Sequence, residues 1–409
     1  MSLSEGTLPT MLVQSLISTA LLLATFPTQT QAVIECNVLN YGAVADNVTD
    51  IGPALTAAWQ NCVIPSVNST VATDVQLLVP SGDFRLTTMV LFNHATHWNF
   101  HLVGNLYLPF NTTLGGIGGT MLQWQNCDNI LFDGPGAIFG NGYRYRENND
   151  LSLFPNRPRL VRFQTCNNIE ITEITLYDAP MFHVTIIGNN NLAHDMTIRA
   201  THVGETDGFD MSGNNKCENI FRRRILLNRP LFSYVHDVIV ENGDECVTVK
   251  TPTNGFRAEN LICIHTAGCN IGSFGAGNTN VSVQNVWYRN VTLNETSDAG
   301  IMIKSYPDNI GFVRNITYHD FTLIEPDFPL YIGVFWRGNG IDTGKLEISD
   351  VHFDGISGFG STTRPAVLLD CNAATPCKNI TFESVYVWGG VANQITNACG
   401  SGFTGVPAC

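Results

Sequence analysis

A short phrase of alternating apolar and polar residues recurs along this chain, and it limits the folds that the chain can adopt. Copies read CDNILFDG, QNVWYRNVTL and RNITYHDFTL, among others. Each copy opens near a polar residue, often Asn, and alternates with period two, as half-buried strands do. Intervals of 25, 30, 32 and 32 residues separate the copies at Asn260, Asn285, Asn315, Glu347 and Asn379. Repeats of this length are typical of stacked units that bury one continuous core.

We therefore expect an all-β fold, a right-handed parallel β-helix. The interval argues against an immunoglobulin-like sandwich, and the lack of a four-strand module argues against a propeller. Charged residues are only 14% of the chain and 37 residues are Gly, which suits strands and tight turns. The one short helical stripe, near Pro53–Asn61, is expected to cap the open N-terminal edge of the solenoid.

The first 32 residues are typical of a secretory signal peptide. An apolar run from Met11 to about Ala24 precedes a candidate cleavage site at residues 30–32. The run is short for a membrane span of about 20 residues. We expect a secreted, extracellular protein, free of the membrane after cleavage, in which residues 33–409 form a single domain.

Twelve cysteines follow this run, and a secreted chain favours disulfides. Sequence proximity predicts the pairs Cys36–Cys62, Cys246–Cys263, Cys371–Cys377 and Cys399–Cys409. The pairing of the others stays open, namely Cys127, Cys166, Cys217 and Cys269. Because no CxxC or clustered His spacing occurs, we expect no metal and no cofactor. Eight glycosylation sequons fit the same compartment: Asn47, Asn68, Asn111, Asn280, Asn290, Asn294, Asn315 and Asn379.

The formal net charge of −14 makes nucleic acid an unlikely partner, because no basic face would displace counterions from phosphates. An acidic polymer would also be repelled overall and would need local cations. We expect a monomer.

One segment, residues 216–234, breaks the pattern and holds four arginines. His194 and His236 begin corresponding strands 42 residues apart, whereas only 24 residues separate Asp237 from Leu261. The first interval exceeds the second by nearly the length of this segment. We therefore expect an insertion that bulges out of the solenoid without joining its sheets. Two origins stay open: a retained intron, or a real surface loop whose arginines attract an acidic polymer.

Acidic side chains gather in residues 205–210 and 242–250. Equivalent positions of neighbouring coils stack about 4.8 Å apart, so Asp207, Asp244 and Glu245 should meet in an outer groove. Crowded carboxylates can hold one member protonated and another charged, as glycosidic hydrolysis requires. A single Asp-Gly pair would more often be an ordinary turn.

These segments resemble family 28 of the glycoside hydrolases, the polygalacturonases and rhamnogalacturonases. The family has, in order, Asn-Thr-Asp, Asp-Asp, Gly-His-Gly and Arg-Ile-Lys. Residues 205–207 are similar to the first with Glu for Asn, 244–245 to the second with Glu for Asp, and 302–304 to the last without its Arg. Gly-His-Gly is missing: Ala267 stands at the His position, and His265 is expected on another face.

In these departures the chain resembles the rhamnogalacturonase branch of the family. The resemblance extends over residues 36–409. The resemblance implies a pectic polysaccharide as partner and hydrolysis of α-glycosidic bonds in rhamnogalacturonan. Alternatives are an exo-acting galacturonohydrolase, a hydrolase of xylogalacturonan or polygalacturonan, and a β-helix that binds polysaccharide without cleaving it. Endo or exo action stays open.

The resemblance also implies roles for five residues. Asp244 would be the general acid, Glu245 and Asp207 would hold and activate the water, Lys304 would bind a substrate carboxylate, and Asp210 would support the cluster. The family inverts the anomeric configuration, for which carboxyl separations of about 6.5–9.5 Å are expected.

Overall fold

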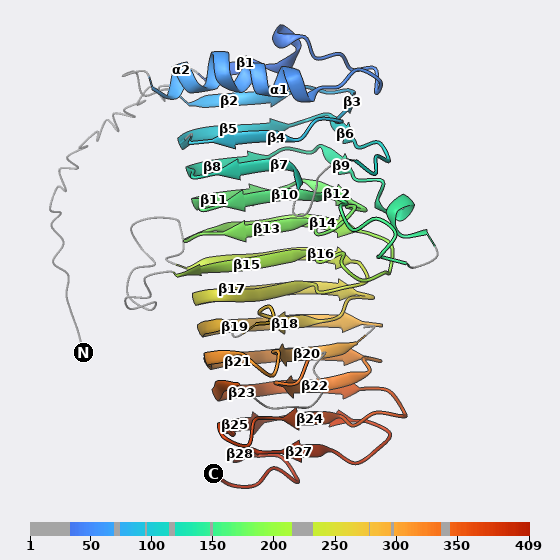
Figure 1. Cartoon of the computed structure of the whole chain (residues 1–409), viewed down its shortest axis with the longest axis vertical. Helices are drawn as coiled ribbons and strands as arrows, with labels where there is room; N and C mark the ends of the chain where they lie inside the picture. Colours follow the sequence, from blue (N-terminus) through green and yellow to red (C-terminus); the bar gives the residue numbers. More distant parts are fainter. Residues whose placement is uncertain are drawn as a thin grey trace, which may run out of the picture. The chain divides into compact units, whose positions relative to one another are not determined.

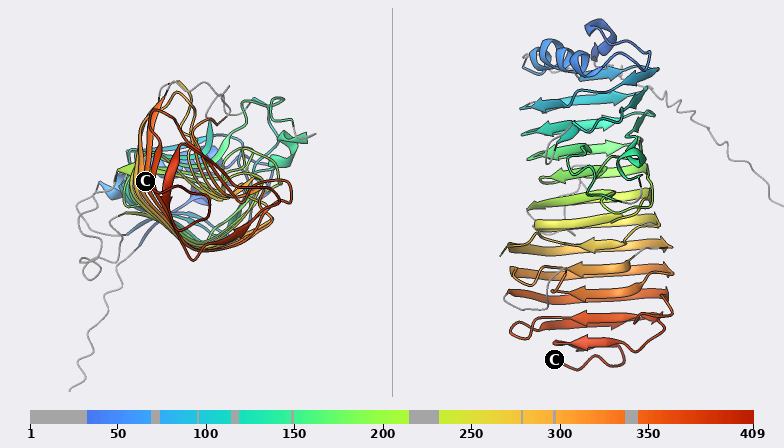
Figure 2. Two further views of the ribbon diagram at one scale, coloured as in Figure 1. Left: turned by 90° about the horizontal axis from the view of Figure 1, so that it is seen from below. Right: turned by 45° about the vertical axis from the view of Figure 1, so that its right-hand side comes forward.

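The repeat folds as predicted, into a right-handed parallel β-helix of stacked coils (Figure 1). The computed structural model describes residues 33–68, 74–94, 96–113, 119–147, 150–214, 232–277, 279–295, 298–336 and 344–409. Within them 28 strands form one continuous sheet that wraps around the core, and every strand pairing is parallel. Viewed along the stack, the coils superpose (Figure 2). Val33–Cys409 is one compact unit.

The sheet has three faces, which the chain visits in order. The short strands of the first face are β1 (Ile34–Asn37), β2 (Val75–Val79), β5 (Thr96–Leu102), β8 (Asp128–Asp133), β11 (Asn167–Thr172), β25 (Cys377–Glu383) and β28 (Ala398–Ser401). Those of the second face are β3 (Asp83–Arg85), β6 (Asn105–Tyr107), β9 (Ala137–Phe139), β12 (Thr175–Tyr177) and β26 (Tyr386–Trp388).

The third face carries the acidic segments. Its strands are β4 (Val90–Asn93), β7 (Thr120–Gln125), β10 (Arg159–Gln164), β13 (Val184–Ile187), β15 (Phe209–Asn214), β18 (Cys269–Ile271), β20 (Ala299–Lys304), β22 (Phe328–Gly333), β24 (Val367–Asp370) and β27 (Gln394–Thr396). Longer strands bend from the first face into the second: β14 (Leu192–Arg199), β16 (Ser233–Glu241), β17 (Val247–Ile264), β19 (Asn280–Asn294), β21 (Ile310–Ile324) and β23 (Lys345–Phe359). The start of β17 lies in the third face.

The recurring asparagines lie at the corners of the coil, where the backbone adopts positive φ. Asn285 and Asn315 have φ of 59° and 55°, a conformation that Asn tolerates better than most side chains do. Their amides form a ladder, with Asn315 Nδ2 donating to Asn285 Oδ1. A second ladder joins Asn290 Nδ2 to Asn260 Oδ1 at 2.7 Å. Each such bond contributes on the order of 1 kcal/mol to stability.

These ladders correct the alignment of repeats expected from the sequence. Asn260 was matched with Asn285, but it lies beside Asn290, at a different corner. The neighbour of Asn315 is Asp350 and not Glu347. Both corners use a polar residue before an alternating run, so the intervals alone do not distinguish them.

The inward-facing side chains stack from coil to coil into one hydrophobic core. The Trp124 and Phe163 rings lie 4.7 Å apart, and Tyr318 stacks between Tyr288 and Phe353 at 5.3 and 5.5 Å. Burial of such side chains stabilises by roughly 1.5–3 kcal/mol each.

Helical turns cover the N-terminal end of this core, where the sequence predicts a cap (Figure 1). They comprise α1 (Gly52–Ala58), a π-helical turn (Trp59–Val63) and α2 (Ile64–Val67). Ala54, Leu55 and Ala58 face the core. Two 3-10 turns, Val38–Tyr41 and Gly142–Tyr145, complete the helical segments of the described residues.

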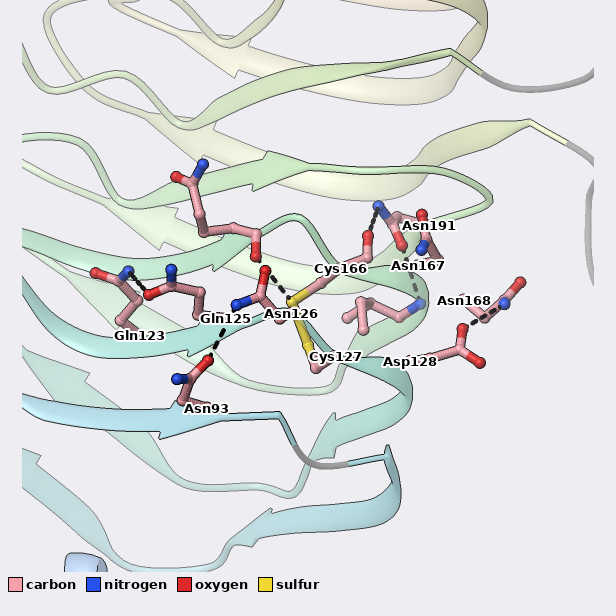
Figure 3. The surroundings of a disulfide bond; sticks show 12 residues. Asn93, Gln123, Gln125, Asn126, Cys127, Asp128, Cys166, Asn167, Asn168 and Asn191 are labelled. Atoms are coloured by element: carbon pink, nitrogen blue, oxygen red, sulfur yellow. Dashed lines mark hydrogen bonds between the residues drawn. A yellow bond between two sulfur atoms is a disulfide. The ribbon is translucent and has the colours of Figure 1, made fainter.

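Five disulfides join the described cysteines, and four of them are the pairs predicted from sequence proximity. The fifth, Cys127–Cys166, links the starts of β8 and β11 in adjacent coils (Figure 3). Cys269 is a buried free thiol, and Cys217 lies outside the described residues.

The predicted insertion 216–234 extends too far at its C-terminal end. Ser233 and Tyr234 belong to β16 and pair with Phe256 and Arg257 of β17. Residues 216–231 lie outside the described residues, as does the predicted signal segment 1–32. No helix among the described residues is long and apolar enough to cross a membrane. None of the eight sequon asparagines is buried.

Candidate active site

The predicted acids lie in the turns that lead from the second face into the third. Asp207 precedes β15 and Asp244–Glu245 precede β17 in the next coil. Because Phe209 pairs with Val247, Asp207 and Glu245 occupy equivalent positions. Gly208 N donates to Glu245 O at 2.8 Å and fixes this register.

The three carboxylates converge as the stacking argument predicts. One oxygen from each of Asp207, Asp244 and Glu245 lies within 4.8 Å of the other two. Asp207 is 2% exposed and Glu245 4%, whereas Asp244 is partly exposed. These nearest oxygens are closer than the roughly 6.5–9.5 Å of typical inverting pairs.

A buried asparagine holds the two turns against each other. Asn242 Nδ2 donates to Thr206 O at 2.8 Å and to Glu245 O at 3.0 Å. Gly243 N donates to the Thr206 hydroxyl at 2.9 Å. A Cβ on Gly243 would lie 2.0 Å from Val203 N, so only glycine fits this close approach.

A buried histidine supports the turn from the preceding coil. His183 Nε2 accepts a hydrogen bond from Ala179 N, and Nδ1 lies 3.1 Å from both Thr206 O and Asp207 O. Nδ1 therefore carries the proton. Burial lowers the pKa of His183 to about 4, which keeps the ring neutral in this arrangement.

Asp244 is the member of the cluster best suited to hold a proton. Burial, the charge of Glu245 and a hydrogen bond with Glu245 raise its pKa well above the usual value. Two backbone donors, Glu205 N at 2.5 Å and Glu245 N at 3.0 Å, orient the carboxyl group. Burial and the neighbouring carboxylates Glu245, Asp244 and Asp210 also raise the pKa of Asp207.

Glu245, in contrast to Asp244, favours the charged form. Burial opposes its charge, but Lys304, the hydrogen bond from Asp244, and Lys250 outweigh burial and hold its pKa well below the usual value. The Lys304 ammonium forms an ion pair with Glu245 and lies 4.4 Å from the centre of the Trp336 ring. Lys304 is only 5% exposed. The expected substrate-binding lysine is thus already engaged by the cluster itself.

Sequence reasoning missed a second cation, Lys250. Its Nζ lies 3.5 Å from Asp210 Oδ1 and donates to Gly272 O at 3.0 Å. Asp210, Glu245 and the other acids raise the pKa of Lys250 despite its burial. Lys250 lies two residues beyond Thr248, which pairs with Asp210. Strand alternation could therefore have placed Lys250 beside the acids.

The departures from the family pattern have clear positions. Glu205 turns away from the cluster and forms an ion pair with Arg157. Ala267, at the missing His position, donates its backbone N–H to Asp244 O at 2.7 Å. His265 lies on another face as expected, where its ring stacks on His202 at 3.9 Å and pairs with Glu295.

Three sets of side chains in the described ranges bring three potential ligand atoms within 4.8 Å of one another. The first is Cys246, Cys263 and Cys269, but a disulfide joins two of its sulfurs. The second is the acid cluster, and the third is His352, Asp354 and Glu383 on the outside of the coil. At the acid cluster, Lys250 and Lys304 already supply positive charge, which would oppose a dication.

The arrangement places a carboxyl group whose pKa is raised beside a carboxylate whose pKa is lowered, in a largely buried cluster. Asp244 can donate a proton and Glu245 can accept one, which is the pairing that general acid–base chemistry needs. Asp207 and Asp210 surround the charged group, and two lysines compensate it.

Comparison with known proteins shows the family and the fold. The profile of "Glycosyl hydrolases family 28" matches residues 69–404. "Rhamnogalacturonase A" of Aspergillus niger is 31% identical, covering 90% of this chain and 75% of the relative. "Probable rhamnogalacturonase E" of Aspergillus flavus is 32% identical, covering 93% and 77%. The solved endo-xylogalacturonan hydrolase from Aspergillus tubingensis has a TM-score of 0.73 at 20% identity, covering 92% of this chain and 100% of that one, and shares the fold.

Proposed function

We propose that this chain, which belongs to glycosyl hydrolase family 28 and is a glycoside hydrolase, cleaves the rhamnogalacturonan backbone of pectin outside the cell. The observation that carries the proposal is a cluster of three carboxylates within 4.8 Å of one another, in which Lys304 pairs with Glu245 and leaves the neighbouring Asp244 without an ion-pair partner among the described residues. The pKa of Asp244 is raised and that of Glu245 is lowered. Asp244 is then the acid and Glu245 the base.

Asp244 delivers its proton to the glycosidic oxygen as the bond to the leaving sugar breaks. Its partial exposure lets a substrate reach it, and its two backbone contacts fix its direction. Glu245 removes a proton from the attacking water. Asp207, one coil away at the equivalent position, holds that water by hydrogen bonding. General acid–base catalysis of this kind contributes roughly 10²–10⁴-fold to rate.

The Lys304 ammonium pairs with Glu245, the proposed base, and is therefore not free to bind a substrate carboxylate. Lys250 and Asp210 form a second pair beside the cluster. With both cations engaged, the site favours a polymer with fewer carboxylates. Rhamnogalacturonan alternates rhamnose with galacturonate and carries half as many as polygalacturonan, and the relatives are named for it.

The test is a substrate comparison. The purified chain is incubated with rhamnogalacturonan, xylogalacturonan and polygalacturonan, and reducing ends and product lengths are measured. We expect the highest kcat/KM on rhamnogalacturonan. Preference for another galacturonan would refute the substrate, and release of monomers alone would assign exo action. Binding without new reducing ends would leave a polysaccharide-binding β-helix.

Export and modification are tested in a secretory host. We expect the mature chain in the medium to begin near Val33, and glycosidase treatment to lower its mass because the sequon asparagines carry glycans. Retention of residues 1–32 would contradict the signal peptide. Sequencing the transcript decides the origin of residues 216–231: a message that contains them and yields active enzyme excludes a retained intron.

A further inference from the structure

A row of aromatic rings lies on the outer side of the second face, before the turns that carry the acid cluster. Tyr107, Phe139 and Tyr177 end β6, β9 and β12. Their rings stack with centroids 4.7 Å apart and planes within 5° and 8°. Arg85 lies beside Tyr107 in the preceding coil, and Arg199 lies beside Tyr177 in the following one. We call these five residues the aromatic groove.

The surface over this row has two shallow, open depressions. One depression of about 300 Å³ is lined by Arg85, Tyr107, Phe139 and Tyr177. Another of about 610 Å³ is lined by Tyr177, Arg199, His202 and Glu241, among others. Both depressions include Tyr143, Tyr177 and Asp178, so they lie next to each other along the coils. Neither depression is lined by any of the three catalytic carboxylates, and their open shape suits an extended chain lying on the surface.

The wall of the groove is fixed before any ligand arrives. Asp178, which lines both depressions, accepts hydrogen bonds from Arg146 at 2.5 Å, from the Thr201 hydroxyl at 3.0 Å and from Tyr143 N at 2.5 Å. Arg146 is buried and also donates to Ala179 O. A rigid wall reduces the entropy that binding would cost.

We propose that the aromatic groove is a second, non-catalytic binding site for an acidic polysaccharide chain. This rests on the proposed function, and the occupant is the same galacturonate-containing polymer. Tyr177 ends the stack because the next coil presents Arg199, so the ring has a face toward the larger depression on which a sugar can pack. Tyrosine hydroxyls at either end of the stack can pair with sugar hydroxyls.

The arginines supply the charge that an acidic polymer needs. Arg85 and Arg199 lie four strand steps apart, roughly 19 Å at about 4.8 Å per step, which spans several sugar residues. Guanidinium groups bind carboxylates in bidentate fashion. The Arg199 side chain is 58% exposed, and its contact to Glu241 is long, at 3.9 Å. A uronate can therefore reach it at the cost of one weak surface pair.

The experiment separates polymer binding from catalysis. Tyr177→Ala and Arg199→Ala are introduced both into the active chain and into Asp244→Asn, and binding of rhamnogalacturonan polymer is measured by affinity electrophoresis. Each change should weaken polymer binding roughly 5–30-fold, as expected for loss of one good contact. Turnover of a short oligosaccharide that fits only the catalytic cluster should stay within about 2-fold.

Matched controls are Tyr386→Ala and Arg314→Ala, an exposed tyrosine and an exposed arginine elsewhere on the coil. They should leave polymer binding unchanged. Unaltered binding in Arg199→Ala would overturn the proposal, since this exposed residue can change without unfolding the chain. If the unmodified chain cleaves no pectic oligosaccharide, the proposed function fails. If the unmodified chain cleaves the oligosaccharide but the Tyr177→Ala and Arg199→Ala variants bind polymer as the parent does, only the proposal of the aromatic groove is refuted.

Discussion

Replacing Lys304 with methionine removes the cation that compensates the charge of Glu245. Both side chains are at least 94% buried, and the methionine keeps most of the apolar contact with Trp336. Removing one partner of a buried ion pair costs about 3–5 kcal/mol, because the remaining charge has no partner. For a folded unit of this size, each kcal/mol lowers the melting temperature by about 1 °C. We therefore expect a loss of roughly 3–6 °C at pH 7.

The sign of the pH dependence follows from Glu245. Its pKa is depressed in the folded protein, so the ion pair contributes stability above about pH 4.3, the usual value of glutamate. This contribution is lost as pH falls through the lowered folded pKa. In Lys304→Met the carboxyl group becomes protonated, so the deficit should be largest at pH 7 and small near pH 4. Activity should fall in kcat, since the base is then neutral.

The assay is thermal unfolding from pH 4 to 7, beside kinetics on rhamnogalacturonan. Lys345→Met, at an exposed lysine, is the matched control and should change neither property. The double variant Lys304→Met/Glu245→Gln should recover most of the stability but no activity. The reasoning is refuted if Lys304→Met is as stable as the control, or if its only defect is a raised KM for acidic substrates.

Three further outcomes are expected. Burial and neighbouring charges raise the pKa of Asp207, so above about pH 4 the unfolded chain releases this proton more readily than the folded one, and stability falls as pH rises. Asp207→Asn should therefore unfold at a higher temperature than the parent at pH 7 but not at pH 3, and equal melting at pH 7 would contradict this. Lys250→Met should move the acid limb of kcat/KM to higher pH, since Lys250 lowers the pKa of Asp210 and Glu245; an unmoved limb would remove it from the electrostatics of the site. Product NMR during the first minutes should show the inverted β-anomer, because an Asp207 with a raised pKa and an ion-paired Glu245 are poor nucleophiles. We expect this although the nearest carboxylate oxygens lie within 4.8 Å of one another. An initial α-anomer would indicate retention.

The repeat is sufficient to predict the fold. Alternation with period two within each copy indicates strands, and spacing of the copies by the length of one coil indicates a solenoid, whichever copies are compared. It did not give the register. Asn260 and Asn285 look alike in sequence because each precedes an alternating run, yet they occupy different corners. Register depends on the hydrogen bonds between coils, such as that from Asn290 to Asn260, which intervals do not encode.

The acids could be predicted to converge because stacking places equivalent turns of adjacent coils together. Their protonation states could not, because these depend on burial and on which ammonium contacts which carboxylate. Lys304 illustrates this: the motif places it in the groove, but only the structure pairs it with Glu245. Sequence proximity does not predict the Cys127–Cys166 disulfide, because 39 residues separate the two cysteines and only the coil brings them together.

The most direct test of the account is the pH-dependent turnover of rhamnogalacturonan by Asp244→Asn. Asparagine keeps the shape of the side chain but has no proton to donate to the leaving oxygen. We predict that kcat falls by at least roughly 10²–10⁴-fold while the polymer is still bound, and that the alkaline limb of the profile disappears. Turnover near that of the parent chain, with the alkaline limb intact, would contradict the assignment of Asp244 as the acid.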